Sequence, residues 1–148
     1  MALKYTHMGA EDYVCWDDFL QQYPDRFDRF DYDVSVGEGL IPAESVHTVE
    51  ERRMRELTMK RIDVVAWKGD SPTIIEVKPN AKTPVIGQVM AYRRLYQEKF
   101  SLAFPPLAAI VCYSIDPDVE HVAQNEGIEV IQVKKLPHEL PPEGLIPE

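Results

Sequence analysis

Several features that place sequences in well-known classes are absent from these 148 residues. No run of eighteen apolar residues occurs, so no segment is expected to span a membrane. The first twenty residues lack a basic and then apolar leader, which argues against secretion. The only two cysteines, Cys15 and Cys112, lie far apart. We expect both to be buried free thiols in a reducing cytoplasm.

Histidine is also scarce, and the spacing of the four residues excludes the usual zinc motifs; they are His7, His47, His121 and His138. With 45% hydrophobic residues, the chain is long enough to form one globular domain that buries about two thirds of its unfolded surface. We assign residues 1–135 to this domain. Residues 136–148 contain four prolines and predict a tail without a core role, which is either mobile or docks a partner.

The net charge of −9 is unfavourable for binding a polyanion, but the charge is unevenly distributed. Residues 52–99 hold eleven lysines and arginines against five acidic residues, whereas the remainder holds five against twenty. Basic charge confined to one segment of an acidic chain is the pattern expected of a phosphate-binding cleft. The alternative is an ordinary solvated helix face.

The basic segment contains two predicted strands, residues 61–67 and 73–78, joined by a turn at Gly69-Asp70. If these two residues form a two-residue hairpin loop, Asp63 lies directly opposite Glu76. Because side chains alternate along a strand, Glu76 and Lys78 then share one face. The hairpin thus brings two carboxylates and an ammonium group together.

Such a trio suits phosphodiester hydrolysis assisted by a hard cation. Two carboxylates and a backbone carbonyl supply part of the oxygen shell that Mg²⁺ prefers, and the ion activates water and offsets charge on the phosphate. A neighbouring lysine orients or deprotonates the water, or stabilises the pentacovalent phosphate. The alternative is a surface salt bridge between Glu76 and Lys78 on the solvated side of the hairpin.

Asp63, twelve intervening residues and then Glu76-Val77-Lys78 resemble the motif of the PD-(D/E)XK nuclease superfamily. Gln88 and Tyr92 are similar to the Q-x-x-x-Y motif of its RecB-like branch. The resemblance implies a metal-dependent nuclease in which Asp63, Glu76 and the Val77 carbonyl bind Mg²⁺ or Mn²⁺ and Lys78 is catalytic.

Two features depart from the family pattern. Ile62 stands where many members have proline before the aspartate. The acidic residue that many members carry on the first helix has no unique counterpart, because four residues compete for this position: Glu11, Asp12, Asp17 and Asp18.

The remaining patterns predict an α/β fold. We expect a helix over residues 11–23, a strand over 29–36, a helix over 84–100 with Thr83 as its N-cap, a strand over 107–115, a helix from Asp116 to about 125 and a strand over 128–133. The strand–helix–strand unit at the end predicts a parallel crossover. The resulting order, αβββαβαβ, matches a restriction-endonuclease-like core with helices on both faces of a mixed sheet.

Residues 40–58 are charge-dense and predict either a short helix or an arm. Their arginines, together with one on the later helix, are candidate contacts to a nucleic-acid backbone; these residues are Arg52, Arg53, Arg55 and Arg93. Those of the 40–58 segment could equally pair with nearby glutamates. On the helix over 84–100, Gln88 and Tyr92 share one face and are placed to hold a DNA strand beside Lys78, although a tyrosine at this spacing also suits the core.

The sequence therefore predicts a small metal-dependent deoxyribonuclease without base specificity, typical of those encoded by bacteriophages or prophages. Its expected partners are DNA and a divalent metal, its location the host cytoplasm, and its oligomeric state is open. Two alternatives remain: a non-catalytic phage assembly or virion component built on a nuclease-like fold, and a metal-dependent RNase on the same core.

Overall fold

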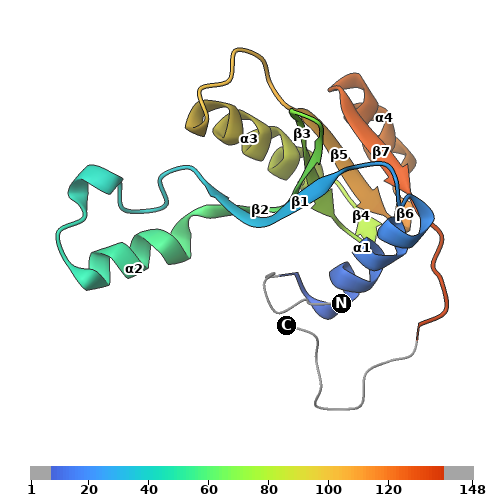
Figure 1. Cartoon of the computed structure of the whole chain (residues 1–148), viewed down its shortest axis with the longest axis horizontal. Coiled ribbons are helices and arrows are strands. Elements are labelled where there is room, and N and C mark those ends of the chain that lie inside the picture. The colour runs from blue at the N-terminus through green and yellow to red at the C-terminus, as the bar shows by residue number, and fades with distance from the viewer. Residues whose placement is uncertain (1–7, 139–148) are drawn as a thin grey trace.

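The computed structural model describes residues 8–138 (Figure 1). The helices in this part of the chain are α1 (Ala10–Gln22), the 3₁₀ turn η1 (Ala43–Ser45), α2 (Val49–Thr58), α3 (Pro84–Lys99) and α4 (Pro117–Asn125). The strands are β1 (Arg29–Val36), β2 (Lys60–Lys68), β3 (Ser71–Val77), β4 (Asn80–Ala81), β5 (Leu107–Cys112), β6 (Ser114–Ile115) and β7 (Ile128–Gln132). No described helix is long and apolar enough to cross a bilayer.

Five strands form one open mixed sheet in the order β1-β2-β3-β5-β7. The first three are antiparallel neighbours, and the β2–β3 hairpin has the predicted register, with Lys68 opposite Ser71. The β3–β5 and β5–β7 pairs are parallel, so the predicted crossover through α4 is confirmed. Strand β3 is therefore the place where the antiparallel half of the sheet meets the parallel half.

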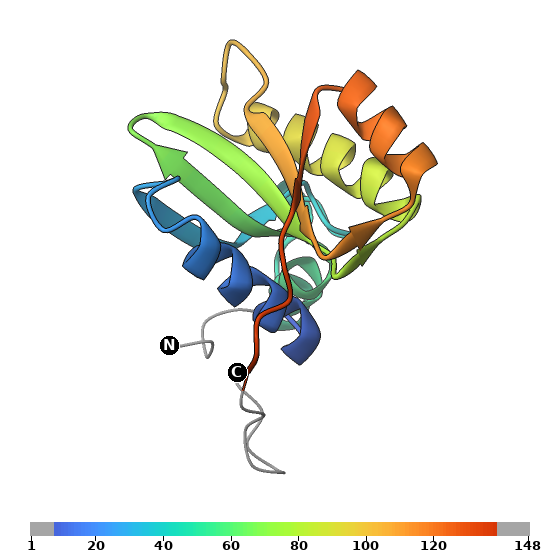
Figure 2. The ribbon, with the colours of Figure 1, turned by 90° about the vertical axis from the view of Figure 1, so that its right-hand side faces the viewer.

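Helices cover both faces of this sheet, as predicted (Figure 2). On one face, α1 buries Trp16 and Phe19 against the alternate residues Ile75 and Val77 of β3. On the opposite face, α3 and α4 pack over the other set of alternate residues, which includes Ile74 and Ile110. The apolar run in β5 is buried throughout from Ala108 onwards because the strand has helices on both sides.

The β1–β2 ribbon changes faces at one point along its length. The paired residues Tyr32 and Val64 pack on the α1 side. Val34 and Ile62, which also pair with each other two residues further along the ribbon, pack on the α3 side. Regular alternation would keep all four on one face. The change occurs at the intervening residues, where Asp33 takes a left-handed φ of 54° that aspartate tolerates better than most side chains. Asp63 is the residue opposite this twist.

Residues 40–58 form an arm that includes a helix, so both features predicted for this segment are present. In Figure 1 the arm projects from the β1 and β2 ends, and α2 buries no side chain. Polar contacts hold it together: Arg55 donates to the backbone oxygens of Glu38 and Ile41. Gly39 has a φ of 67°, and a Cβ there would lie 2.7 Å from the Thr58 hydroxyl oxygen, so the turn requires glycine.

Two local predictions for the later elements are wrong. The strand expected over residues 107–115 ends at Cys112, because the backbone N–H groups of Tyr113 and Ser114 turn aside and donate to the Pro79 carbonyl. β6 then pairs with β4 in a separate two-stranded sheet that the sequence did not indicate. Thr83 precedes α3 as predicted but already has helical dihedral angles, and its side chain makes no capping hydrogen bond.

The chain contacts α1 just before and at the start of the predicted tail, and none of the described tail residues 136–138 is buried in the core. Gln22 exchanges two hydrogen bonds with the backbone of Lys134, and the Leu136 N–H donates to Asp18. The His138 imidazole also hydrogen-bonds to Asp18. The rest of the tail lies outside the described residues.

We predict that Phe19→Ala lowers the free energy of unfolding by about 3–5 kcal/mol, because this ring is fully buried between α1 and the sheet. Phe104→Ala removes the same number of atoms from a side chain that is 81% exposed and should change stability by less than about 0.5 kcal/mol. Urea unfolding of both variants measures the difference. Equal losses would show that the packing on this face of the sheet is not as described.

Candidate functional site

Asp63 and Glu76 each accept a hydrogen bond from the backbone of the other strand, at the point where β2 and β3 separate. The β2–β3 ladder ends at Val64 opposite Ile75, and at the next residue pair side chains replace the backbone partners. The Asp63 N–H donates to Glu76 Oε1 at 3.2 Å, and the Val77 N–H donates to Asp63 Oδ2 at 3.0 Å. The predicted proximity is confirmed, but the contact is reciprocal side chain to backbone bonding and not a regular cross-strand pair.

These hydrogen bonds fix the direction of the Val77 carbonyl. The N–H and C=O groups of one strand residue project toward the same neighbouring strand, so the Val77 carbonyl is directed into the gap that its N–H shares with Asp63. The Lys78 N–H points the other way and donates to Val111 of β5. The two carboxylates thus lie together at the end of β3, as the sequence predicted, and strand geometry directs the Val77 carbonyl toward the same gap.

Glu76 is withdrawn from water, and Asp63 is half-buried. Glu76 is only 4% exposed, and burial followed by the negative charge of Asp63 raises its pKa to about 9. Burial also raises the pKa of Asp63, although the hydrogen bond from Val77 opposes this effect. Two adjacent acids that share a dry site repel each other when ionised. A pair of this kind is found at functional sites more often than at structural ones.

Lys78 and Asp12 complete the charged surroundings of this pair. The Lys78 ammonium group favours the ionised forms of Asp63, Glu76 and Asp12, and so lies near all three. Asp12 is half-buried at the start of α1; burial raises its pKa, and its charge in turn raises that of Asp63. Among the four acidic residues that competed on the first helix, Asp12 is therefore the one that faces the site.

Asp17 and Asp18 lie elsewhere, so a metal role for either residue at this site is wrong. Asp18 is fully buried and accepts a hydrogen bond from the Tyr113 hydroxyl at 2.5 Å as well as bonding to His138. Asp17 accepts from Gln21 on its own helix. About one and a half turns of helix separate these residues from Asp12, and the sequence alone did not distinguish the two faces.

The two residues of the Q-x-x-x-Y motif flank the site from α3. Tyr92 is half-buried, and its pKa is raised first by burial and then by the negative charges of Glu76 and Asp63. Its hydroxyl therefore stays protonated next to the carboxylates. Gln88 lies one turn earlier and borders the same space as Lys78. The predicted grouping of both residues with Lys78 agrees with these positions.

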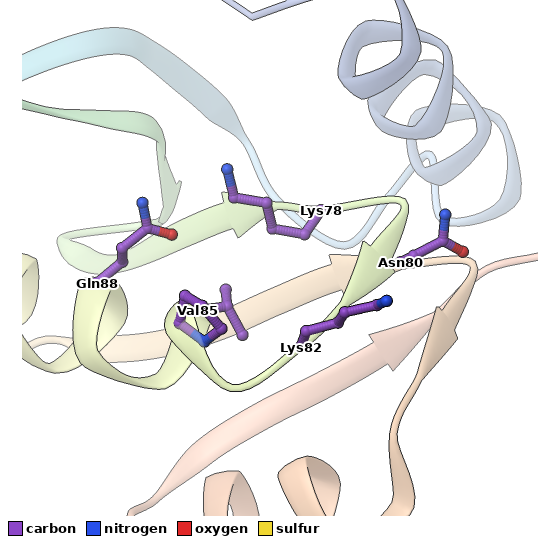
Figure 3. A pocket seen from close by; sticks show the side chains of 6 residues that line it. Lys78, Asn80, Lys82, Val85 and Gln88 are labelled. Carbon is purple, nitrogen blue, oxygen red and sulfur yellow. The ribbon is translucent and has the colours of Figure 1, made fainter.

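A pocket of about 270 Å³ adjoins Lys78 (Figure 3). It lies between the end of β3, the short strand β4 and the first turn of α3. Lys78 and Gln88 border one side of it, and Lys82 extends toward Asn80 on the other. The remaining lining residues are Pro84 and Val85. Sequence reasoning missed Asn80 and Lys82, since neither belongs to a motif.

The four candidate arginines are not gathered at this site. Arg93 lies beside Gly127, near the turn between α4 and β7, so it does not join Gln88 and Tyr92 on their face of α3. Arg55 pairs with Glu38 at 2.7 Å inside the arm. Arg52 and Arg53 are exposed on α2. A phosphate contact by Arg52 or Arg53 would therefore use the arm and not the pocket.

The donor set suits a hard divalent cation. Asp63, Glu76 and the Val77 carbonyl offer only oxygen, which matches the preference of Mg²⁺ and Mn²⁺. A cation between the two carboxylates would also offset the negative charge of Asp63, which together with burial raises the pKa of Glu76. Across residues 8–138, no cluster of three histidine, cysteine or acidic side chains is close enough to hold an ion alone. An ion at this site would therefore need the carbonyl, water or substrate as further ligands.

Comparison with known proteins supports the fold only. No protein-family model matches the chain, and no curated protein is similar enough to count as a match. The crystal structure of a protein of unknown function, AF1548, is similar over 82% of this chain, with a TM-score of 0.50 and 14% identity. The chain spans 56% of the length of that protein. The chain thus has a mixed α/β fold that is also present in a solved structure.

The raised pKa of Glu76 predicts an unusual dependence of stability on pH. Folded Glu76 keeps its proton up to about pH 9, whereas an unfolded glutamate loses it near pH 4.3. The folded state therefore binds more protons, and this contribution to stability falls as the pH rises through that window. We predict that Glu76→Gln, which cannot ionise, is more stable than the wild type by at least about 1 kcal/mol at pH 8 and that this difference shrinks toward pH 5.

Urea unfolding at several pH values between these limits measures this difference. Glu44→Gln is the matched control, because Glu44 is an exposed glutamate in η1 and its substitution should leave the profile unchanged. If Glu76→Gln were less stable than the wild type at every pH, the two carboxylates would not repel each other as described.

Proposed function

We propose that this protein is a metal-dependent nuclease of the PD-(D/E)XK type that hydrolyses phosphodiester bonds in DNA. The observation that carries the proposal is the hydrogen-bonded pair of half-buried Asp63 on β2 and buried Glu76 on β3, with Lys78 next to it. A structural salt bridge would not need two mutually repelling acids in a dry position. The element order and the sheet with helices on both faces support a restriction-endonuclease-like core.

Each side chain has a role that its position supports. Asp63, Glu76 and the Val77 carbonyl would hold the divalent ion, which would supply charge neutralisation on the phosphate and an activated water. The Lys78 ammonium group donates hydrogen bonds to the attacking water or to the phosphate oxygens. The protonated Tyr92 hydroxyl and the Gln88 amide donate to the backbone of the strand. Asp12 orients Lys78 through its charge.

The proposed substrate is DNA without base specificity. The residues at the site are suited to phosphate oxygens and metal, and phosphate contacts position a strand without reading its sequence. The alternative substrate is RNA, and a cleavage assay with both DNA and RNA distinguishes the two. Free ends or branches are the DNA forms to include, because the resemblance is to enzymes that process DNA.

We predict that Mg²⁺ or Mn²⁺ raises the thermal unfolding midpoint, and does so more at pH 9 than at pH 6. The ion competes with the protons that the carboxylate pair retains at lower pH, so its affinity rises as they leave. Glu76→Gln should remove most of the shift at both pH values. Differential scanning fluorimetry with and without metal measures it, and an equal shift in the variant would place the ion elsewhere.

We predict that Lys78→Ala lowers kcat for DNA cleavage by about 100-fold or more, because a charge aimed at the reacting phosphate is lost. Lys68→Ala is the matched control: it removes the same charge at the other end of the hairpin, roughly 20 Å away along β3. Both variants should keep the wild-type unfolding midpoint within about 2 °C. Cleavage of linear, circular and branched DNA and of RNA with Mg²⁺ or Mn²⁺ measures the effect.

A second candidate function is a non-catalytic assembly component, and the arm favours it. Val49 and Leu57 of α2 are 76% and 70% exposed, and Leu40 at the base of the arm is 77% exposed. Exposed apolar side chains on a projecting element are typical of protein docking. If the wild-type protein cuts no DNA or RNA form with either metal, the nuclease proposal is wrong and the assembly function replaces it.

A further inference from the structure

The pocket beside Lys78 has a lining that is unusual for this chain. The protein carries 25 acidic residues, yet none of the six side chains that border the pocket is acidic. Two are lysines, Lys78 and Lys82, and two are amides, Asn80 and Gln88. All four of these can donate hydrogen bonds, and both lysines carry positive charge. A pocket of this composition selects an anion with several oxygens.

The Asn80 amide is held with its donor side available. The Ser114 hydroxyl donates to Asn80 Oδ1 at 2.7 Å, so the oxygen of the amide is occupied and the NH₂ group remains to donate elsewhere. The pairing of β4 with β6 sets Asn80 opposite Ser114 and fixes the backbone at this point. Asn80 therefore contributes a positioned donor at the edge of the pocket.

Lys82 follows directly from this small sheet and is exposed. No ion pair involving Lys82 is found among residues 8–138, whereas the exposed Lys68 pairs with Asp28 at 3.4 Å. Backbone bonds from Val85 to Lys82 and from Ile86 to Thr83 start α3 directly after it. The lysine is thus attached to a rigid base, with its ammonium group on the side of the pocket opposite Gln88 (Figure 3).

The pocket and the carboxylate pair share Lys78, so they are adjacent parts of one surface. Lys78 lies near Asp63 and Glu76 on one side and borders the pocket on the other. We propose that this pocket binds a phosphate group of the substrate strand next to the phosphate that is attacked, with Lys82 and Asn80 as its ligands. The proposal rests on the proposed function, and it adds two binding residues that no motif identified.

The phosphate has two sources, an internal linkage or a terminal 5′-phosphate. In either case one ionic contact is made by Lys82, which acts on binding and not on the chemical step. Loss of that contact weakens binding to all sequences equally. It also lowers the salt dependence of the binding constant by the amount that corresponds to about one phosphate contact. These effects are measurable without metal and without cleavage, which separates this proposal from the nuclease proposal.

The test uses fluorescence anisotropy with single-stranded oligonucleotides that carry either a 5′-phosphate or a 5′-hydroxyl, in EDTA and over a range of salt. We expect Lys82→Ala to weaken binding about three- to tenfold and to lower the salt slope by roughly 0.7. Asn80→Ala should weaken binding less, because an uncharged donor is lost. Lys68→Ala, which removes the same charge at the far end of the hairpin, should bind like the wild type.

The two oligonucleotides distinguish the sources. A Lys82→Ala loss confined to the 5′-phosphorylated strand assigns the pocket to a terminal phosphate, and an equal loss on both assigns it to an internal one. If Lys82→Ala and Lys68→Ala bind alike, or if the wild type binds neither strand, the pocket proposal is overturned. In a cleavage assay the same variant should raise KM with kcat within about twofold. If Lys82→Ala weakens binding as expected but the wild type cleaves no substrate, only the nuclease proposal is overturned.

Discussion

The reciprocal hydrogen bonds between Asp63 and the Glu76-Val77 segment are the interaction on which the site depends. They take the place of backbone–backbone hydrogen bonds where β2 and β3 separate. The two carboxylates therefore satisfy backbone N–H groups that have no partner in the regular ladder. Each carboxylate oxygen used in this way satisfies a buried N–H that would otherwise cost about 1–3 kcal/mol. Because the pKa of Glu76 is raised to about 9, this acid stays protonated at neutral pH and does not repel Asp63. The carboxyl groups that hold the two strands together are thus also the proposed metal ligands.

The sheet order explains why α1 and α3 both reach these atoms. β3 has an antiparallel neighbour on one side and a parallel neighbour on the other, and the chain leaves its carboxyl end toward α3. Ligand sites of open α/β sheets commonly lie outside the carboxyl ends of strands where the topology changes. The change of face in β1 and β2 occurs at Asp33, next to the point where the pairing of β2 with β3 ends. Asp12 and Tyr92 then approach from opposite faces.

Local patterns predicted the parts of the site that lie on one hairpin or one helix. The turn at Gly69-Asp70 fixed the register, and the period of two placed Glu76 with Lys78. What local patterns could not supply was the relative rotation of separate elements. Asp12 and Asp18 belong to the same helix, and only packing against β3 and the docked tail shows that they serve different places. The same limit hid the β4–β6 pair, since two-residue strands carry no periodicity.

The distribution of charge over the whole molecule affects how a polyanion would approach this site. Exposed acidic residues over most of the chain repel a polyanion, so a strand gains favourable contacts only where acids are buried, neutralised or absent. At the end of β3, Glu76 is buried and Asp63 half-buried beside Lys78, and the lining of the adjoining pocket contains no acidic residue. The basic residues of the arm stand apart from both. A net charge of −9 is therefore compatible with the proposed nucleic-acid substrate, because the pocket at the end of β3 offers Lys78 and Lys82 without an acidic residue in its lining.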